Sequence, residues 1–314
     1  MRTFWLHIFF LCGISVAFAQ HPVAVLHAGA ESSILVSSTP SVNASSHTIP
    51  FELINGMIVV EAALNERVGK FILDTGAPGI VLHSRQLPTK VATAVGIGGT
   101  CAYSPVHIRN FSWLNHHWEN VEGVALDLSH LERAVGQRLR GLIGYEFLSQ
   151  HTVFIDYDQR RITIWSSESG PEDFPYRVRQ RIPFHLVDHL PILHLKANGK
   201  RLRLALDSGS ETNLLADAAF ARVTDRRSIT GTPHEVQGLD QQILTTRMVR
   251  LSNLRHRRNA LPDLDFLLLD FAPLRAQTGL VLDGLLGFSF LQQFPYSIDY
   301  QRGELIIYDP FHYR

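Results

Sequence analysis

Two stretches of this chain share one residue pattern, and this repetition restricts the possible folds more than any other feature of the sequence. FELINGMIVVEAALNERVGKFILDTG (residues 51–76) aligns without a gap on FHLVDHLPILHLKANGKRLRLALDSG (residues 184–209). In each copy, two apolar strands flank a polar turn, which predicts a β-hairpin that ends in an aspartate, Asp74 or Asp207. The chain is therefore expected to consist of two similar lobes.

The similarity resumes further along each half of the chain. GLIGYEFL (residues 141–148) pairs with GLLGFSFL (residues 284–291), and FIDYDQRRITIW (residues 154–165) pairs with SIDYQRGELIIY (residues 297–308). Short runs of Val, Ile, Leu and Phe, broken by Gly, Pro, Asn and Asp, predict strands over most of both halves. The sequence thus predicts an all-β, two-lobed fold built from an internal duplication.

Helix is expected to be scarce, and its clearest candidate lies in the first lobe. The segment SHLERAVGQ (residues 129–137) begins with Ser129 and has Glu132 three residues later. This spacing is typical of a capping box, in which the serine would be the N-cap residue.

The predicted organisation has five parts. They are a signal peptide (1–19), a Ser-rich flexible leader (20–49), an N-terminal lobe (50–165), a linker rich in Ser, Pro, Gly and charge (166–181), and a C-terminal lobe (182–314). The signal peptide is predicted because Arg2 precedes a long apolar run that ends in the small residues of AFA (17–19). The mature protein is expected to be exported, to the periplasm or the medium.

Charge and cysteine content limit the remaining possibilities. The formal net charge is zero, which argues against a nucleic-acid partner, because such a surface needs a basic excess. Of the two cysteines, Cys12 lies in the predicted signal peptide, so the mature chain would keep only Cys101 and no intramolecular disulfide is expected. No other stretch is long and apolar enough to span a bilayer, and we expect no stable membrane insertion and a monomer.

The two aspartates are the candidate functional residues. An ionised carboxylate at the end of a buried strand is costly unless it is paired or hydrogen-bonded, so something must satisfy Asp74. The second aspartate, Asp207, ends the matching hairpin in the other lobe. Two carboxyl groups brought together cannot both ionise easily; they share a proton and titrate as a pair.

These residues carry a resemblance to a known family. Asp74-Thr75-Gly76 with a downstream Leu-Ile-Gly (142–144), and Asp207-Ser208-Gly209 with a downstream Leu-Leu-Gly (285–287), resemble the aspartic proteases of the pepsin and retropepsin type. The resemblance covers residues from about 50 to 310 and is closest to bacterial exported aspartyl proteases with two retropepsin-like repeats in one chain.

The resemblance implies an aspartic endopeptidase with Asp74 and Asp207 as the catalytic dyad. One carboxylate would take a proton from a water while the other protonates the peptide carbonyl, so no acyl-enzyme forms. Thr75 and Ser208 would hydrogen-bond across the lobe junction. Gly76 and Gly209 would let backbone amides approach the carboxylates without a Cβ in the way. The implied partner is a peptide or protein substrate, and no cofactor is expected.

A β-hairpin flap that closes over the dyad is also implied by the family. The segment VGIGGTCAY (95–103) has the matching position, with Gly96, Gly98 and Gly99 as its glycines. Gly238 marks a second candidate in HEVQGLDQQ (234–242). Both segments also fit ordinary surface turns, in which glycine is common.

The triplets differ in the next residue, which is Ala77 in one lobe and Ser210 in the other. In the family, a hydroxyl at this position can donate a hydrogen bond to the neighbouring carboxylate and lower its pKa. Ser210 is therefore predicted to donate to the carboxylate of its own lobe.

Alternative chemistries have weaker support in the sequence. His185, His189 and His194 occupy a strand-rich segment, and no HExxH motif or cysteine cluster accompanies them, so no metal site is predicted. The second functional class is a module that binds peptides, or processes a single partner, on the same fold with little general protease activity.

Overall fold

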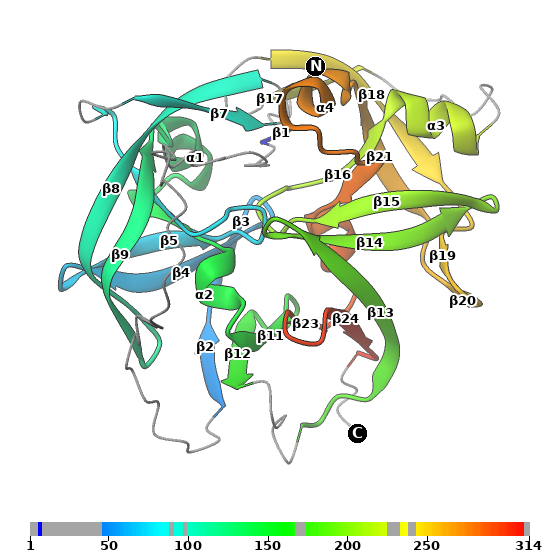
Figure 1. Cartoon of the computed structure of the whole chain (residues 1–314). Helices are drawn as coiled ribbons and strands as arrows, with labels where there is room; N and C mark the ends of the chain where they lie inside the picture. The colour runs from blue at the N-terminus through cyan, green and yellow to red at the C-terminus, as the bar shows by residue number, and fades with distance from the viewer. Residues whose placement is uncertain are drawn as a thin grey trace, which may run out of the picture.

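The computed structural model describes residues 6–7, 46–87, 91–96, 99–166, 174–224, 233–237 and 243–310. Within them the protein is mostly β, with one lobe on each side and a set of strands from both halves of the chain below them (Figure 1). The predicted all-β, two-lobed fold is confirmed. No helix in these ranges is long and apolar enough to cross a membrane.

The first lobe contains a sheet of eight strands among the described residues, in the order β3-β4-β5-β10-β6-β9-β8-β7. The strands are β3 (Glu52–Ile54), β4 (Met57–Leu64), β5 (Arg67–Leu73), β6 (Ile80–His83), β7 (Ala92–Gly96), β8 (Gly99–Trp113), β9 (His116–Leu126) and β10 (Leu139–Ile143).

The second lobe has strands that run in the order β1-β17-β18-β21-β16-β22-β15-β14, with β19 and β20 at the side of β14. They are β1 (Leu6–His7), β14 (Leu190–Ala197), β15 (Lys200–Leu206), β16 (Asn213–Ala216), β17 (Pro233–Gln237), β18 (Ile243–Leu251), β19 (Arg255–His256), β20 (Asn259–Ala260), β21 (Leu264–Leu269) and β22 (Gly284–Leu286).

Six strands continue this sheet beneath both lobes, in the order β13-β24-β23-β11-β12-β2. They are β2 (His47–Pro50), β11 (His151–Asp156), β12 (Arg161–Ser166), β13 (Val178–Val187), β23 (Tyr296–Asp299) and β24 (Glu304–Tyr308). Strand β11 of the first half pairs antiparallel with β23 of the second, which joins the two halves through backbone hydrogen bonds. Strands β2 and β13 begin inside the ranges predicted as leader and linker, and the domain boundaries stay a prediction.

The strand pairing around the two aspartates is the same in both lobes. In the first, β5 pairs parallel with β10, β10 antiparallel with β6, and β6 parallel with β9. In the second, β15 pairs parallel with β22, β22 antiparallel with β16, and β16 parallel with β21. Each aspartate follows the strand that pairs with the Leu-Ile-Gly or Leu-Leu-Gly segment, so the topology brings the two motifs of each lobe together.

Five short helices cover the described parts of the lobes. They are α1 (Ser129–Val135), α2 (Tyr145–Leu148), α3 (Asp217–Val223), α4 (Ala272–Thr278) and α5 (Phe288–Leu291). The predicted capping box of α1 is wrong, because Leu128 is the N-cap residue and Ser129 already lies in the helix. Asp127 accepts the Ser129 N–H at 2.9 Å, while Glu132 turns away to bind Arg85 and the Leu139 N–H.

Candidate active site

The two aspartates are placed at the lobe junction by corresponding strands of the two lobes. Asp74 directly follows β5, and Asp207 directly follows β15. The Asp74 N–H donates to the Ile143 carbonyl at 2.9 Å, and the Asp207 N–H donates to the Leu286 carbonyl at 3.0 Å. Both aspartates are buried, with 1% and 0% of their surface exposed. Each aspartate is thus anchored to a neighbouring strand through its backbone N–H group.

The hydroxyl residues of the two triplets hold the lobes together. The Thr75 N–H donates to Ser208 Oγ at 3.1 Å, and the Ser208 N–H donates to Thr75 Oγ1 at 2.9 Å. In turn, Thr75 Oγ1 donates to the Leu206 carbonyl and Ser208 Oγ donates to the Leu73 carbonyl. These four hydrogen bonds cross the junction, so the predicted contact between Thr75 and Ser208 is confirmed.

The glycines of the triplets are also placed as predicted. The Gly76 N–H donates to Asp74 Oδ1 and the Gly209 N–H donates to Asp207 Oδ1, both at 2.8 Å. A Cβ on Gly76 would lie 2.7 Å from Asp207 Oδ1, and one on Gly209 would lie 2.5 Å from Asp74 Cγ. Each glycine therefore packs against the carboxyl group of the opposite lobe, at a distance that no other residue allows.

The second oxygen of each carboxyl group, Oδ2, is the atom that can take part in a reaction. Asp74 Oδ2 and Asp207 Oδ2 are buried, and neither forms a hydrogen bond of standard geometry with the described part of the protein. Buried polar atoms are normally hydrogen-bonded, and those that are not often have a catalytic role. The two Oδ2 atoms are therefore the positions at which a shared proton, a water and a substrate carbonyl can bind.

Burial controls the charge of the pair. Removal from water raises the pKa of both carboxyl groups, and the charge of Asp74 raises the pKa of Asp207 further. For Asp74, the neighbouring Asp207 side chain and the N–H groups of Gly76 and Ala77 partly oppose the effect of burial. The two groups titrate as a pair, which keeps a shared proton to a higher pH than two exposed aspartates would.

We expect this burial to reduce the stability of the protein at neutral pH. Because the folded pKa of Asp207 lies above its unfolded value, the folded chain holds a proton that the unfolded chain releases. The stability that this bound proton contributes is present below the unfolded pKa of Asp207. It is lost as the pH rises through the folded pKa of Asp207. Replacing Asp207 by the uncharged Asn should raise the free energy of unfolding by about 1–3 kcal/mol at neutral pH.

Denaturant unfolding of Asp207→Asn and the wild type as a function of pH measures this difference. The gain should vanish below about pH 4, where the aspartate is protonated in both states. A variant that is less stable than the wild type at neutral pH would contradict this account of the site.

One detail of the sequence prediction is wrong. Ser210 does not donate to a carboxylate, because its Oγ donates to the carbonyl of Thr212 at 2.8 Å. Its backbone carbonyl accepts the Phe288 N–H, as the Ala77 carbonyl accepts the Tyr145 N–H in the first lobe. The backbone carbonyls of Ala77 and Ser210 thus accept the same hydrogen bond in the two lobes. The hydroxyl of Ser210 is bound to Thr212, so it does not lower the pKa of a dyad carboxyl group through a hydrogen bond.

The candidate flaps are hairpins in the described structure. Strands β7 and β8 pair antiparallel, with Gly96 opposite Gly99 as the last pair, and Gly98 lies outside the described residues. Strands β17 and β18 form the corresponding hairpin of the second lobe, and Gly238 also lies outside the described residues. Both hairpins lie at the top of Figure 1, and their role as flaps stays a prediction.

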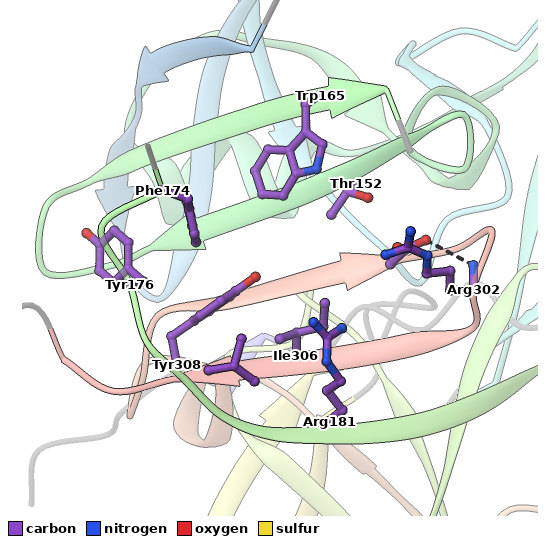
Figure 2. A pocket seen from close by; sticks show the side chains of 10 residues that line it. Thr152, Trp165, Phe174, Tyr176, Arg181, Arg302, Ile306 and Tyr308 are labelled. Atoms are coloured by element: carbon purple, nitrogen blue, oxygen red, sulfur yellow. Dashed lines mark hydrogen bonds and ion pairs between the residues drawn. The ribbon is translucent and has the colours of Figure 1, made fainter. Parts of the chain in front are cut away.

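A pocket of about 260 Å³ lies away from the dyad, on the sheet that joins the lobes (Figure 2). Its lining includes Trp165 and Tyr308, whose neighbours Ile164 and Ile307 point into the main core. Since successive side chains of a strand point to opposite faces, the pocket opens on the far face of this sheet. It therefore does not contribute to the site around Asp74 and Asp207.

The three histidines considered for a metal site do not form one group. His185 and His194 contact each other on the exposed face of β13 and β14, whereas His189 is buried and contacts the carbonyl of Gly76. Among the described residues, no group of three or more His, Cys, Asp or Glu is placed to hold a metal ion. No pattern in the sequence predicts the contact between His189 and Gly76, because it joins residues of different lobes.

Buried aromatic side chains beneath the dyad were also missed. Tyr157 of the first half packs against Phe51 and Phe288, with ring centroids at 5.8 and 5.2 Å. Its counterpart Tyr300 packs against Phe184 at 5.9 Å and Tyr145 at 5.3 Å. The tyrosines occupy the same position in FIDYD and SIDYQ, which was the available signal.

Comparisons with known proteins agree with this site in the second lobe. A family model described as aspartyl protease matches residues 193–290, a range that includes Asp207 and the Leu-Leu-Gly segment. No curated protein matches the chain. Among solved structures, basic 7S globulin from soybean is similar, with 8% sequence identity and a TM-score of 0.46 over 85% of this chain and 95% of that one. The family match and the site geometry support an aspartyl-protease type of protein.

Proposed function

We propose that this protein is an aspartic endopeptidase that hydrolyses peptide bonds through Asp74 and Asp207. The observation that carries the proposal is the pair of buried carboxyl groups from two lobes, each held by a glycine N–H on one oxygen and open on the other. Raised pKa values keep one proton on the pair at mildly acidic pH, as acid–base catalysis requires.

The proposed reaction uses the two carboxyl groups in different roles. Ionised Asp74 takes a proton from a water whose oxygen attacks the peptide carbonyl carbon, while protonated Asp207 donates its proton to the carbonyl oxygen. In the tetrahedral gem-diol intermediate, one hydroxyl then returns its proton to Asp207 as the C–N bond breaks, and Asp74 gives its proton to the leaving nitrogen. The products are a carboxylic acid and an amine, and the dyad regains its starting state.

The substrate class follows from the surroundings of the dyad. Hairpins β7–β8 and β17–β18 occupy corresponding positions in the two lobes and would close over an extended peptide. We further propose that the chain consists of two retropepsin-like repeats, because strand pairing around Asp74 recurs around Asp207. Export to the periplasm or the medium, and action as a monomer, are proposed from the N-terminal sequence and the presence of both aspartates in one chain.

The test is digestion of a denatured protein mixture, with new termini identified by mass spectrometry. The most rapidly cleaved peptide is then assayed from about pH 3 to about pH 8. Because burial raises the pKa of both carboxyl groups, the acid limb of kcat/KM should lie above the value of an exposed aspartate, about 3.9. We expect a bell-shaped profile centred at mildly acidic pH.

Two results would contradict the proposal in different ways. A profile whose acid limb lies at or below that of an exposed aspartate would mean that burial does not control the dyad. Absence of new termini at every pH, together with peptide binding measured by calorimetry, would instead identify a peptide-binding module on this fold.

A further inference from the structure

A histidine of the second lobe contacts the aspartate loop of the first lobe. His189 lies in the turn between β13 and β14, is 8% exposed, and has its Nε2 2.9 Å from the carbonyl oxygen of Gly76. A carbonyl oxygen can only accept a hydrogen bond, so Nε2 must carry the proton. Both the neutral Nε2–H tautomer and the imidazolium make this bond, so protonation of the ring does not break it.

The contact reaches Asp74 through one peptide group. The Gly76 carbonyl belongs to the same peptide unit as the Ala77 N–H. This N–H donates to the backbone carbonyl of Asp74 at 3.2 Å, and it lies close enough to the carboxyl group to lower its pKa. A hydrogen bond to the carbonyl of a peptide polarises the unit and makes its N–H a stronger donor. The imidazole therefore acts on Asp74 through one peptide group, whose N–H holds the backbone of Asp74 and lies near its carboxyl group.

The first lobe has no counterpart of this histidine. In the alignment of the two halves, His189 corresponds to Gly56, and Tyr145 corresponds to Phe288. A Cβ on Gly56 would lie 2.8 Å from Cδ1 of Phe288, and Gly56 has a φ of +78°, so no larger side chain fits there. On the other side, the rings of His189 and Tyr145 are 6.5 Å apart, which leaves room for the imidazole. Position 56 therefore supplies no equivalent donor to the Asp207 loop.

We propose that His189 is a positioning residue that fixes the first aspartate loop from the opposite lobe and biases the charge of the dyad toward Asp74. This inference rests on the proposed function, because it assigns the base and the acid within the same dyad. It explains how two nearly equivalent carboxyl groups acquire different roles when their triplets make matching hydrogen bonds.

Other ionisable groups of the described structure also face the dyad. Asp207 faces Asp74 directly. The charges of both carboxyl groups raise the pKa of Tyr300, whereas the pKa of Tyr157 is raised by the charge of Asp207. On the side of His189, the neighbouring groups are Tyr145 of α2 and Asp188 in the same turn. His189 is the ionisable side chain in the described structure whose hydrogen bond ends on one aspartate triplet and has no equivalent on the other.

The test compares an apolar variant with one that keeps the donor. His189→Leu removes the hydrogen bond, whereas His189→Gln places an amide N–H at a similar distance from the backbone. The control is His185→Gln, since His185 lies on the adjoining strand and its described partner is the exposed His194. If His189→Leu does not fold, His189→Met replaces it, because the flexible Met side chain adapts to the same space.

The expected result is a change in the dyad and not in substrate binding. His189→Leu should lower kcat about tenfold with KM nearly unchanged, and should move the acid limb of the pH profile upward by a few tenths to about one unit. His189→Gln should recover most of the activity and the wild-type limb. The control, His185→Gln, should match the wild type in kcat and in the position of the acid limb.

A second readout does not require peptidase activity. Carbon-13 NMR of the aspartate carboxyl groups, assigned with Asp74→Asn and Asp207→Asn, follows the titration of the pair directly. The inference holds if the first ionisation rises in His189→Leu but not in His189→Gln, and it fails if the titration is the same in all variants. If no protein of the series cleaves peptides while the titrations still differ, the proposed function fails and the role of His189 stands.

Discussion

Replacing either Asp74 or Asp207 by asparagine is expected to lower kcat/KM by at least about a thousandfold. An amide can neither take a proton from a water nor donate one as a carboxylic acid does, and the remaining carboxyl group cannot perform both steps. Asparagine nearly preserves the shape of aspartate, and the Gly76 and Gly209 N–H groups can still donate to its side-chain oxygen. The fold should therefore be retained, which makes the loss of activity specific.

The matched control is Asp158→Asn, because Asp158 is an exposed aspartate in the turn that follows β11. Activity is measured on the peptide chosen from the protein digest, and near-ultraviolet circular dichroism checks the tertiary structure. Full activity in either Asp74→Asn or Asp207→Asn would move the active site elsewhere. Equal losses in the control would show that the assay reports general damage.

The dyad could be predicted from the sequence because its signal is local and occurs twice. An aspartate after an apolar strand, a small hydroxyl residue and a glycine have a physical explanation at each position. Burial requires hydrogen bonds for Asp74, the hydroxyl of Thr75 supplies contacts across the junction, and Gly76 leaves space for the opposite carboxyl group. The hydrogen bonds, the contacts across the junction and the free space all come from residues of the motif or of its repeated copy.

The failed predictions concern side chains that had a choice of partner. The sequence predicts that Ser210 donates to a carboxylate, but its hydroxyl donates to the carbonyl of Thr212 within the same turn. Ser129 was expected to cap α1, but Asp127 precedes it and already accepts an N–H at the helix start. Short polar side chains bond to nearby backbone groups in several geometries, so sequence spacing alone does not select among them.

The contacts that the sequence could not show are those between the two lobes. His189 reaches Gly76 across the junction, and Tyr157 and Tyr300 each pack against an aromatic ring from the other half of the chain. Such contacts depend on how the halves dock, which the strand pattern of each half does not specify.

The close packing of each glycine against the opposite carboxyl group leads to the second large expected effect. Gly209→Ala would place a methyl group 2.5 Å from Asp74 Cγ and Oδ1, and Gly76→Ala would place one 2.7 Å from Asp207 Oδ1. The opposing carboxyl group must then move out of the dyad. Because misplacement of a reacting group by about 1 Å can cost about a hundredfold in rate, each variant should lose at least that factor in kcat/KM.

Overpacking at the junction should also lower the free energy of unfolding by about 1–3 kcal/mol. Gly199→Ala is the matched control: Gly199 lies in the β14–β15 turn at a φ of +78°, and a Cβ there meets no atom within 4 Å. Backbone strain should cost this variant about 1 kcal/mol, while its kcat/KM stays at the wild-type value. Thermal unfolding and steady-state kinetics on the three variants separate the two effects. If Gly209→Ala loses stability as Gly199→Ala does but keeps its activity, then the approach of the two loops is a requirement of folding and not of catalysis.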